Sequence, residues 1–267
     1  MYYAGAAYCL VDDLQAWDCG EPCQSNAGIT KFTPIENPFL NTFGYVAYNE
    51  RDNEIVVSFR GTQMHTILNW ISDLDIRMTQ YKGLNESLVH LGFYQTYQYV
   101  SSKVLSAVST YLSESPSATI LVTGHSLGAA LATHAALDIK EAINPSNLSF
   151  YSFGSPRVGN AVFADYIMTL FPNGLYQRVT HYTDLAVHVP LREMNYKHAG
   201  NEVWYMNKGA EMEYAECQNE AGQAENEGCA NSNYWAQDPN SHLIYVGHLL
   251  PGMCKNTQPE SSANFLA

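Results

Sequence analysis

The sequence is poor in positive charge and has no long apolar run. Its 267 residues include 13 Lys and Arg against 26 Asp and Glu, a formal net charge of −13. The phosphates of nucleic acids and anionic membranes would repel such a chain, so we expect no nucleic-acid partner and only neutral or zwitterionic lipid partners. Because no apolar run reaches about 18 residues, no transmembrane segment is expected. Without repeats or a Pro/Ser linker, the simplest prediction is one domain over residues 1–267.

Cysteine is absent from the whole middle of the chain. An even number of cysteines near the two ends predicts disulfides that fasten the termini, because zinc fingers need a further ligand pair at a suitable spacing. Disulfides indicate an oxidising compartment, and glycosylation acceptors at Asn85 and Asn147 agree with secretion. No signal peptide is visible at Met1, so we expect a mature secreted form whose leader has been removed. The six cysteines are Cys9, Cys19, Cys23, Cys217, Cys229 and Cys254.

One serine lies in a turn between a strand-like and a helix-like segment. The β-branched, apolar run 120–122 predicts a buried strand, and the Ala- and Leu-rich run from Leu127 predicts a helix. Between them, Gly124-His-Ser-Leu-Gly128 has the G-x-S-x-G pattern of a nucleophile elbow, in which two glycines allow a tight, strained turn. We therefore predict that Ser126 is a nucleophile and that the N–H of Leu127 stabilises an oxyanion.

Strand-like and helix-like segments alternate along the chain, which predicts an α/β fold with a largely parallel sheet. The first 30 residues suggest a short helix and a pinned loop. The acidic segment 211–237 is predicted to be a surface loop pinned by Cys217 and Cys229. The predicted strands are 43–48, 54–59, 120–122, 148–153 and 176–182, and the predicted helices are 94–113, 127–144 and a third that runs through Tyr166 and Leu170.

A nucleophilic serine needs a carboxylate further along the chain, because this kind of elbow orders its triad as serine, acid and histidine. Asp184 directly follows the predicted strand 176–182, and the apolar residues after it would shield its carboxylate from water. Asp165 and Asp238 are the alternatives. We predict that Asp184 is the acid.

The general base must be a histidine that follows the acid. Histidines that precede the nucleophile, that belong to the elbow, or that lie too close to the acid in sequence are set aside. The remaining candidates are His242 and His248. His242 lies at the end of a turn-rich loop, whereas His248 lies inside an apolar segment and is expected to be structural. His242 is therefore predicted to be the base. The second oxyanion donor is predicted at Gly61-Thr62, after the strand 54–59.

Several segments together resemble the fungal-type class 3 lipases, the secreted triacylglycerol lipases of filamentous moulds. They occur in family order over nearly the whole chain, and the resemblance implies an α/β-hydrolase fold with a triad of Ser126, Asp184 and His242. The segments are Ser58-Phe-Arg-Gly-Thr62, Asn69-Trp-Ile-Ser-Asp-Leu74, His90-Leu-Gly-Phe-Tyr94, Thr123-Gly-His-Ser-Leu-Gly128, Ser155-Pro-Arg-Val-Gly159, Asp184-Leu-Ala-Val-His-Val-Pro190, His198-Ala-Gly-Asn-Glu202 and Ser241-His-Leu-Ile-Tyr245.

The same resemblance implies a cysteine pairing and a short helical lid over about 63–75. The implied disulfides are Cys9–Cys254, Cys19–Cys23 and Cys217–Cys229. A core helix would be the ordinary interpretation of the apolar segment after Thr62, and the resemblance favours a lid that binds a lipid interface. Asp73 resembles the family residue that braces the oxyanion threonine. The apolar lid residues are Met64, Ile67, Leu68, Trp70 and Ile71.

The resemblance implies a triacylglycerol lipase that cleaves the ester bonds of acylglycerols at a lipid–water interface through an acyl-enzyme, without metal or cofactor. A feruloyl-type esterase or a phospholipase A1 of the same fold is the alternative, which an apolar lid disfavours. A lipid-binding module with an inactive site is a further alternative, and the filled catalytic positions disfavour it. Ala129, where many relatives have glycine, and the long acidic segment 211–237 depart from the family pattern. Nothing in the sequence requires a partner chain, so we expect a monomer.

Overall fold

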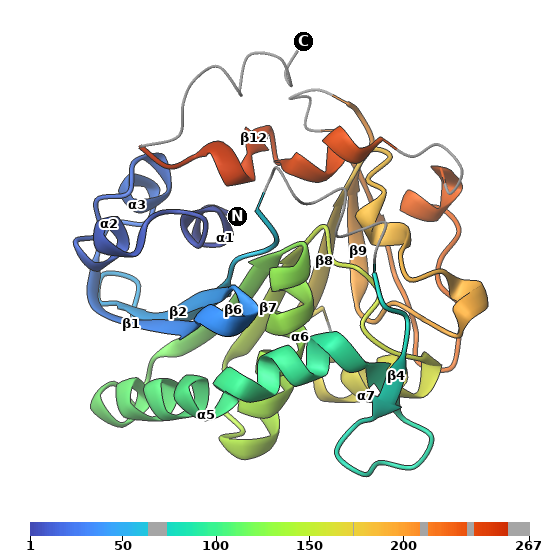
Figure 1. Ribbon diagram of the computed structural model, residues 1–267, viewed down its shortest axis with the longest axis horizontal. Coiled ribbons are helices and arrows are strands. Elements are labelled where there is room, and N and C mark those ends of the chain that lie inside the picture. The colour runs from blue at the N-terminus through green and yellow to red at the C-terminus, as the bar shows by residue number, and fades with distance from the viewer. Residues whose placement is uncertain (64–73, 173, 209–212, 234–237, 256–267) are drawn as a thin grey trace.

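An eight-stranded sheet runs through the computed structural model, which describes residues 1–63, 74–172, 174–208, 213–233 and 238–255 (Figure 1). Its order is β1-β2-β3-β6-β7-β8-β9-β10, and the five strands from β3 to β9 are parallel to one another, whereas the outer strands are antiparallel. The predicted α/β fold with a largely parallel sheet is confirmed. The strands are β1 (Ile29–Asn37), β2 (Thr42–Asn49), β3 (Glu54–Phe59), β6 (Thr119–His125), β7 (Leu148–Phe153), β8 (Tyr176–His181), β9 (Asn201–Tyr205) and β10 (Tyr214–Cys217).

Helices cover both faces of this sheet (Figure 1). One face is covered by α5 (Leu91–Glu114), α6 (Leu127–Ala142) and α7 (Ala161–Leu170), and the other by α1 (Tyr2–Ala6), α2 (Val11–Gln15), α3 (Glu21–Ser25) and the C-terminal segment. Two small hairpins and several 3-10 turns complete the described chain. These are β4 (Met78–Gln80) with β5 (Leu88–His90), β11 (Ile244–Tyr245) with β12 (His248–Leu249), η1 (Pro38–Leu40), η3 (Ala186–His188), η4 (Arg192–Met194), η5 (Ala230–Asn233), η6 (Pro239–Leu243) and η7 (Leu250–Gly252).

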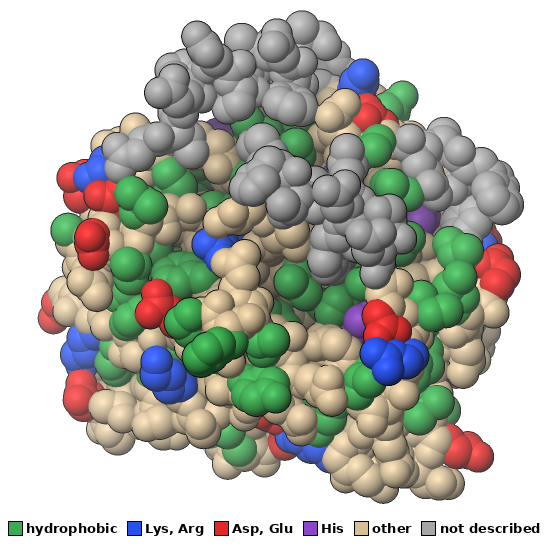
Figure 2. Space-filling model, in the orientation of Figure 1, with side chains coloured by type: hydrophobic (Ala, Val, Ile, Leu, Met, Phe, Trp, Pro, Cys, Tyr) green, Lys and Arg blue, Asp and Glu red, His purple; other side chains and the backbone are tan. Residues whose placement is uncertain are grey.

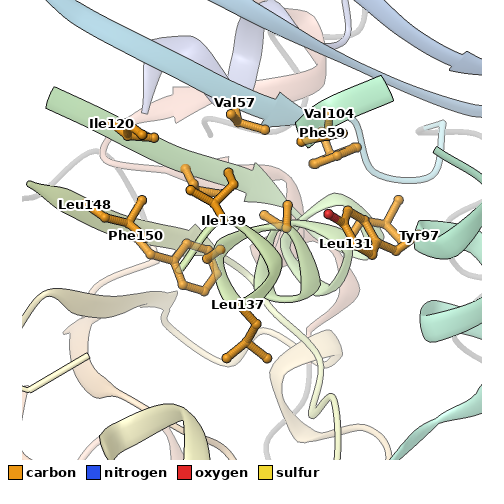
Figure 3. Packing of buried hydrophobic residues seen from close by; sticks show 14 of the residues in the cluster. Val57, Phe59, Tyr97, Val104, Ile120, Leu131, Leu137, Ile139, Leu148 and Phe150 are labelled. Atoms are coloured by element: carbon orange, nitrogen blue, oxygen red, sulfur yellow. The ribbon is translucent and has the colours of Figure 1, made fainter. Parts of the chain in front are cut away.

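The strands bury alternate side chains on opposite faces, which explains why they are apolar throughout rather than in every second position. Val57 packs toward α5 and α6, whereas its neighbour Val56 packs toward the N-terminal helices. Figure 3 shows Phe59, Ile120 and Phe150, from three strands of the sheet, beside α6 on the first of these faces. This double burial fixes the register of the sheet and therefore where its strand ends lie.

The predicted strands 54–59 and 148–153 are confirmed at both ends, but other elements differ from prediction. β1 was not predicted, because an edge strand with a half-exposed, polar sequence has no clear apolar alternation. The prediction of a surface loop over 211–237 is wrong in part. β10 adds a strand to the sheet there, and Glu225 is only 6% exposed. The acidic composition of this segment led to the prediction of a solvent-exposed loop, although part of the segment is buried.

The three disulfides join the cysteines as the family resemblance implies, Cys9–Cys254, Cys19–Cys23 and Cys217–Cys229. The first fastens the start of the chain to its C-terminal segment. Acidic and basic side chains lie singly or in small mixed groups over the face seen in Figure 2, and they form no large patch of one sign there. Within the described ranges, no helix is both long and apolar enough to cross a membrane.

Candidate active site

Ser126 occupies a strained turn between the end of β6 and the start of α6. Its φ of 59° and ψ of −130° lie in a region that side-chain-bearing residues rarely adopt. A Cβ at Gly124 would lie 2.4 Å from the carbonyl oxygen of Gly128, and a Cβ at Gly128 would lie 2.2 Å from that of Phe59. Both glycines are therefore required by close backbone contact, and the strand–turn–helix predicted around Ser126 is confirmed.

Asp184 and His242 form a buried pair although 58 positions separate them in the chain. The Nδ1 atom of His242 lies 2.8 Å from Oδ2 of Asp184, and neither side chain is exposed. A backbone hydrogen bond of 2.8 Å from the N–H of Asp238 to the oxygen of Thr183 joins the segments that carry them. The structure thus brings together the residues predicted to be the acid and the base.

The carboxylate of Asp184 is held ionised by three donors. Burial alone would raise its pKa, but the charge and hydrogen bond of His242, the phenol of Tyr245 and the N–H of Ala186 lower the pKa below its usual value. Because an ionised carboxylate only accepts hydrogen bonds, Nδ1 of His242 must carry the proton. The neutral tautomer with its proton on Nδ1 leaves Nε2 as a hydrogen-bond acceptor.

Two buried atoms at this site have no hydrogen-bond partner among the described residues: the hydroxyl oxygen of Ser126 and Nε2 of His242. The N–H of Ser126 donates to the oxygen of Phe153 at 2.9 Å. A Cβ on the next residue, Gly154, would lie 2.9 Å from Cε1 of His242. Ser126 and His242 therefore both lie against the segment Phe153-Gly154. Among the described residues no hydrogen bond joins the hydroxyl of Ser126 to Nε2 of His242, and a bond between a nucleophile and its base is often looser in the absence of substrate.

His125 holds the backbone of His242 in place, a role that sequence analysis missed by treating it only as part of the elbow. Burial and the neighbouring His242 lower the pKa of His125 to about 3, so the ring is neutral. Its Nε2–H donates to the carbonyl oxygen of His242 at 2.7 Å, and its Nδ1 accepts from the hydroxyl of Tyr8 at 2.6 Å. The signal in the sequence is weak, because both partners lie 117 positions away.

The predicted oxyanion loop lies directly against the nucleophile. A Cβ at Gly61 would be 2.8 Å from Cβ of Ser126 and 2.6 Å from the oxygen of His125. The buried hydroxyl of Thr62 has no partner among the described residues, and Leu127 begins α6, where backbone N–H groups point along the helix axis. Donors are therefore available on both sides of the serine.

The alternative residues serve other purposes. Asp165 forms an ion pair of 2.6 Å with Lys197, Asp238 accepts the N–H of Asn240, and His248 lies 3.4 Å from Glu21. The predicted lid is not covered by the structure. Its residues Met64, Ile67, Leu68, Trp70 and Ile71, together with Asp73, lie outside the described residues.

Comparison with known proteins places this site in a family. The family model for lipase (class 3) matches residues 56–194, which is more than half of the chain. The chain belongs to the class 3 lipase family. A lipase from Rhizopus niveus is 33% identical over 251 residues, which cover 91% of this chain and 60% of that protein. A secreted mono- and diacylglycerol lipase A of Penicillium cyclopium is 33% identical over 169 residues, covering 63% of this chain and 53% of the relative.

The structural comparison agrees with the sequence comparison. A solved triacylglycerol lipase with a serine protease triad at its catalytic centre superposes with a TM-score of 0.84 and 29% identity, covering 94% of this chain and 92% of that one. This member of the class 3 lipase family therefore has the α/β-hydrolase fold. It spans only about three-fifths of the length of the Rhizopus relative, 60%.

Proposed function

We propose that the protein hydrolyses the carboxylic ester bonds of acylglycerols through an acyl-enzyme on Ser126. One observation carries this proposal. Among the described residues, the hydroxyl of Ser126 and Nε2 of His242 are buried without hydrogen-bond partners, and an ionised Asp184 already orients the imidazole of His242. A buried polar atom without a hydrogen-bond partner lowers the stability of the fold. The presence of two such atoms, one a donor and one an acceptor, indicates that a substrate or a proton-transfer step uses them.

The proposed reaction assigns one role to each of these residues. The oxygen of Ser126 attacks the ester carbonyl while Nε2 of His242 takes the hydroxyl proton, and the N–H of Leu127 and the hydroxyl of Thr62 donate to the resulting oxyanion. His242 returns the proton to the leaving alcohol as the ester bond breaks. Water then attacks the acyl group with His242 as its base, which releases the fatty acid and restores Ser126. Asp184 stabilises the imidazolium in both steps.

The substrate class rests on the relatives as well as on the site. The proteins similar to this chain are lipases of triacylglycerols and of mono- and diacylglycerols. A soluble ester would undergo the same chemistry, so feruloyl-type esterase or phospholipase A1 activity would appear as a different substrate preference at the same serine. Bridged cysteines, exposed side chains at Asn85 and Asn147, and a relative named as secreted support our proposal that this protein is exported and glycosylated. We also propose that it acts as a monomer and as one domain.

Hydrolysis of a long-chain triacylglycerol emulsion should be measured beside hydrolysis of a soluble short-chain ester, with wild type and Ser126→Ala. We expect wild type to cleave both and to prefer the emulsion, and the variant to be folded and inert on both. A fluorophosphonate should label wild type and leave Ser126→Ala unlabelled. An active Ser126→Ala variant would refute the assigned mechanism, whereas cleavage of the soluble ester alone would support the esterase alternative.

A further inference from the structure

The turn between β1 and β2 presents two large apolar side chains to solvent. Phe39 is 97% exposed and Leu40 is 43% exposed, and among the described large hydrophobic residues Phe39 is the most exposed. The flanking positions Asn37, Pro38 and Asn41 carry no charge. Two adjacent exposed apolar side chains form a small apolar patch, and exposed apolar patches can mark a site of interaction with a membrane or another protein.

The tip has an ordered shape. The side-chain oxygen of Asn37 accepts the N–H groups of Phe39 at 3.1 Å and Leu40 at 3.3 Å, and the N–H of Asn41 donates to the oxygen of Pro38 at 3.3 Å. Asn41 adopts a left-handed conformation with φ of 48° that closes the 3-10 turn. The ring of Phe39 therefore projects from a fixed turn, and little conformational entropy would be lost if it bound to something.

This tip projects from the same edge of the sheet as the nucleophile. Gly44 at the start of β2 pairs with Phe59 at the end of β3, and Phe59 pairs with Gly124 at the end of β6, just before Ser126. The carboxyl ends of β3 and β6 thus lie beside the base of the β1–β2 hairpin. Figure 1 shows β1 and β2 on the same side of the sheet as β6.

Arg60 connects the tip to the oxyanion loop. Its Nη2 donates to the backbone oxygen of Asn41 at 3.1 Å and to the side-chain oxygen at 2.9 Å, and its N–H donates to the oxygen of Phe43 at 2.9 Å. The next residue is Gly61, which contacts Ser126. A surface that binds the tip would therefore lie next to the site where the ester must enter.

We propose that Phe39 and Leu40 form an anchor that inserts into a neutral or zwitterionic lipid surface and presents the lipid to Ser126. The net charge of −13 would oppose binding to an anionic surface, and the uncharged tip can enter the interfacial region without desolvating an ion. Glu36, which precedes Asn37, and Arg60, which donates to Asn41, are of opposite sign. This inference rests on the proposed function, because it is the lipid substrate that the anchor would bring to the serine.

Binding should be measured without hydrolysis, in the Ser126→Ala background, by flotation with phosphatidylcholine vesicles and with a triolein emulsion. Phe39→Ala should weaken partitioning by about tenfold, whereas Phe39→Leu should retain most of it. Tyr99→Ala is the matched control, because Tyr99 is an aromatic residue with 70% exposure on α5. It should leave partitioning unchanged.

In the active background, Phe39→Ala should keep wild-type kcat/KM on a soluble short-chain ester and lose rate only on the emulsion. Vesicle binding equal to that of wild type in Phe39→Ala, or equal losses in Phe39→Ala and Tyr99→Ala, would overturn the anchor. A concentration-dependent dimer that Phe39→Ala abolishes would also overturn it, in favour of a second copy of the chain as occupant. An inactive wild type that still binds vesicles through Phe39 would overturn the proposed function and leave the anchor standing.

Discussion

A buried ion pair between Arg157 and Glu225 should be a main support of the segment that follows Asp184. The guanidinium contacts both carboxylate oxygens, at 2.7 and 2.8 Å, and the two side chains are 0% and 2% exposed. The same guanidinium donates to the carbonyl oxygens of His188 at 2.6 Å and Pro190 at 3.1 Å. Arg157 thus connects the disulfide-bonded acidic segment to the turn just beyond Asp184, the proposed catalytic acid.

Replacing Glu225 by Met removes the only carboxylate on this guanidinium that the described residues provide, and it leaves a buried, unpaired charge. Such a loss costs about 3–5 kcal/mol in the free energy of unfolding. For a chain of this size the midpoint of thermal unfolding should fall by about 10 °C. The double variant Arg157→Met/Glu225→Met should recover much of this loss, because an apolar pair of similar volume removes the charge as well.

The pH dependence of stability gives a second test of the same pair. Burial would raise the pKa of Glu225, but the hydrogen bonds and charge of Arg157 and the contact with His198 hold it well below its usual range. The unfolded chain therefore binds more protons than the folded one in acid, so this stabilisation is present above the unfolded pKa and is lost as pH falls. In Glu225→Met, the free energy of unfolding should depend less on pH between about 5 and 3.

Chemical and thermal unfolding of the single and double variants measure both effects. Glu227→Met is the control, because Glu227 belongs to the same acidic segment and pairs with Arg192 at the surface, where it is 65% exposed. That pair should contribute less than about 1 kcal/mol. If Glu225→Met unfolds like Glu227→Met, or if the double variant is as unstable as the sum of both single variants, the reasoning is refuted.

Substitutions at three further positions test the proposed site. Tyr245→Phe removes a hydrogen-bond donor to Asp184 and should therefore raise the pKa of that carboxyl. We expect the acid limb of the kcat/KM profile to move to higher pH and activity to fall by about tenfold. An unchanged profile would contradict this role of Tyr245. Gly154→Ala forces a side chain into a φ of 57° and to within 2.9 Å of Cε1 of His242, so kcat should fall at least tenfold while the fold remains by circular dichroism. Thr62→Val should lower kcat by about a hundredfold and Thr62→Ser should restore it, whereas equal rates in both would remove the hydroxyl from the mechanism.

The turn that carries Ser126 and the position of Asp184 could be predicted from the sequence, because each depends on residues that are close together in the chain. The turn around Ser126 needs two glycines close in sequence, and Asp184 directly follows a strand. Placing His242 required only the chain order of the fold and the elimination of other histidines. The structure brings its ring to Asp184, as that order predicts.

The supporting contacts could not be predicted, because they join residues whose sequence neighbourhoods say nothing of their partners. Tyr8 and His125 meet across 117 positions, and Arg157 and Glu225 across 68. Glu225 is surrounded by polar residues that favour a solvated loop. Only the packed fold shows that its carboxylate faces inward. β1 was missed for a related reason, since an edge strand is defined by its partner rather than by its own pattern.

The disulfide between Cys9 and Cys254 makes the protein, in mechanical terms, a closed ring. The bridge joins residues separated by 245 positions, with their Cα atoms only 5.3 Å apart. Tension applied beyond the two cysteines would pass through the sulfur atoms and bypass the sheet, the nucleophile turn and the pair of Asp184 and His242. Residues 10–253, which include Asp184 and His242, therefore lie outside the covalent path of the force, whereas residues 1–8, with the Tyr8 hydroxyl that donates to His125, lie within it.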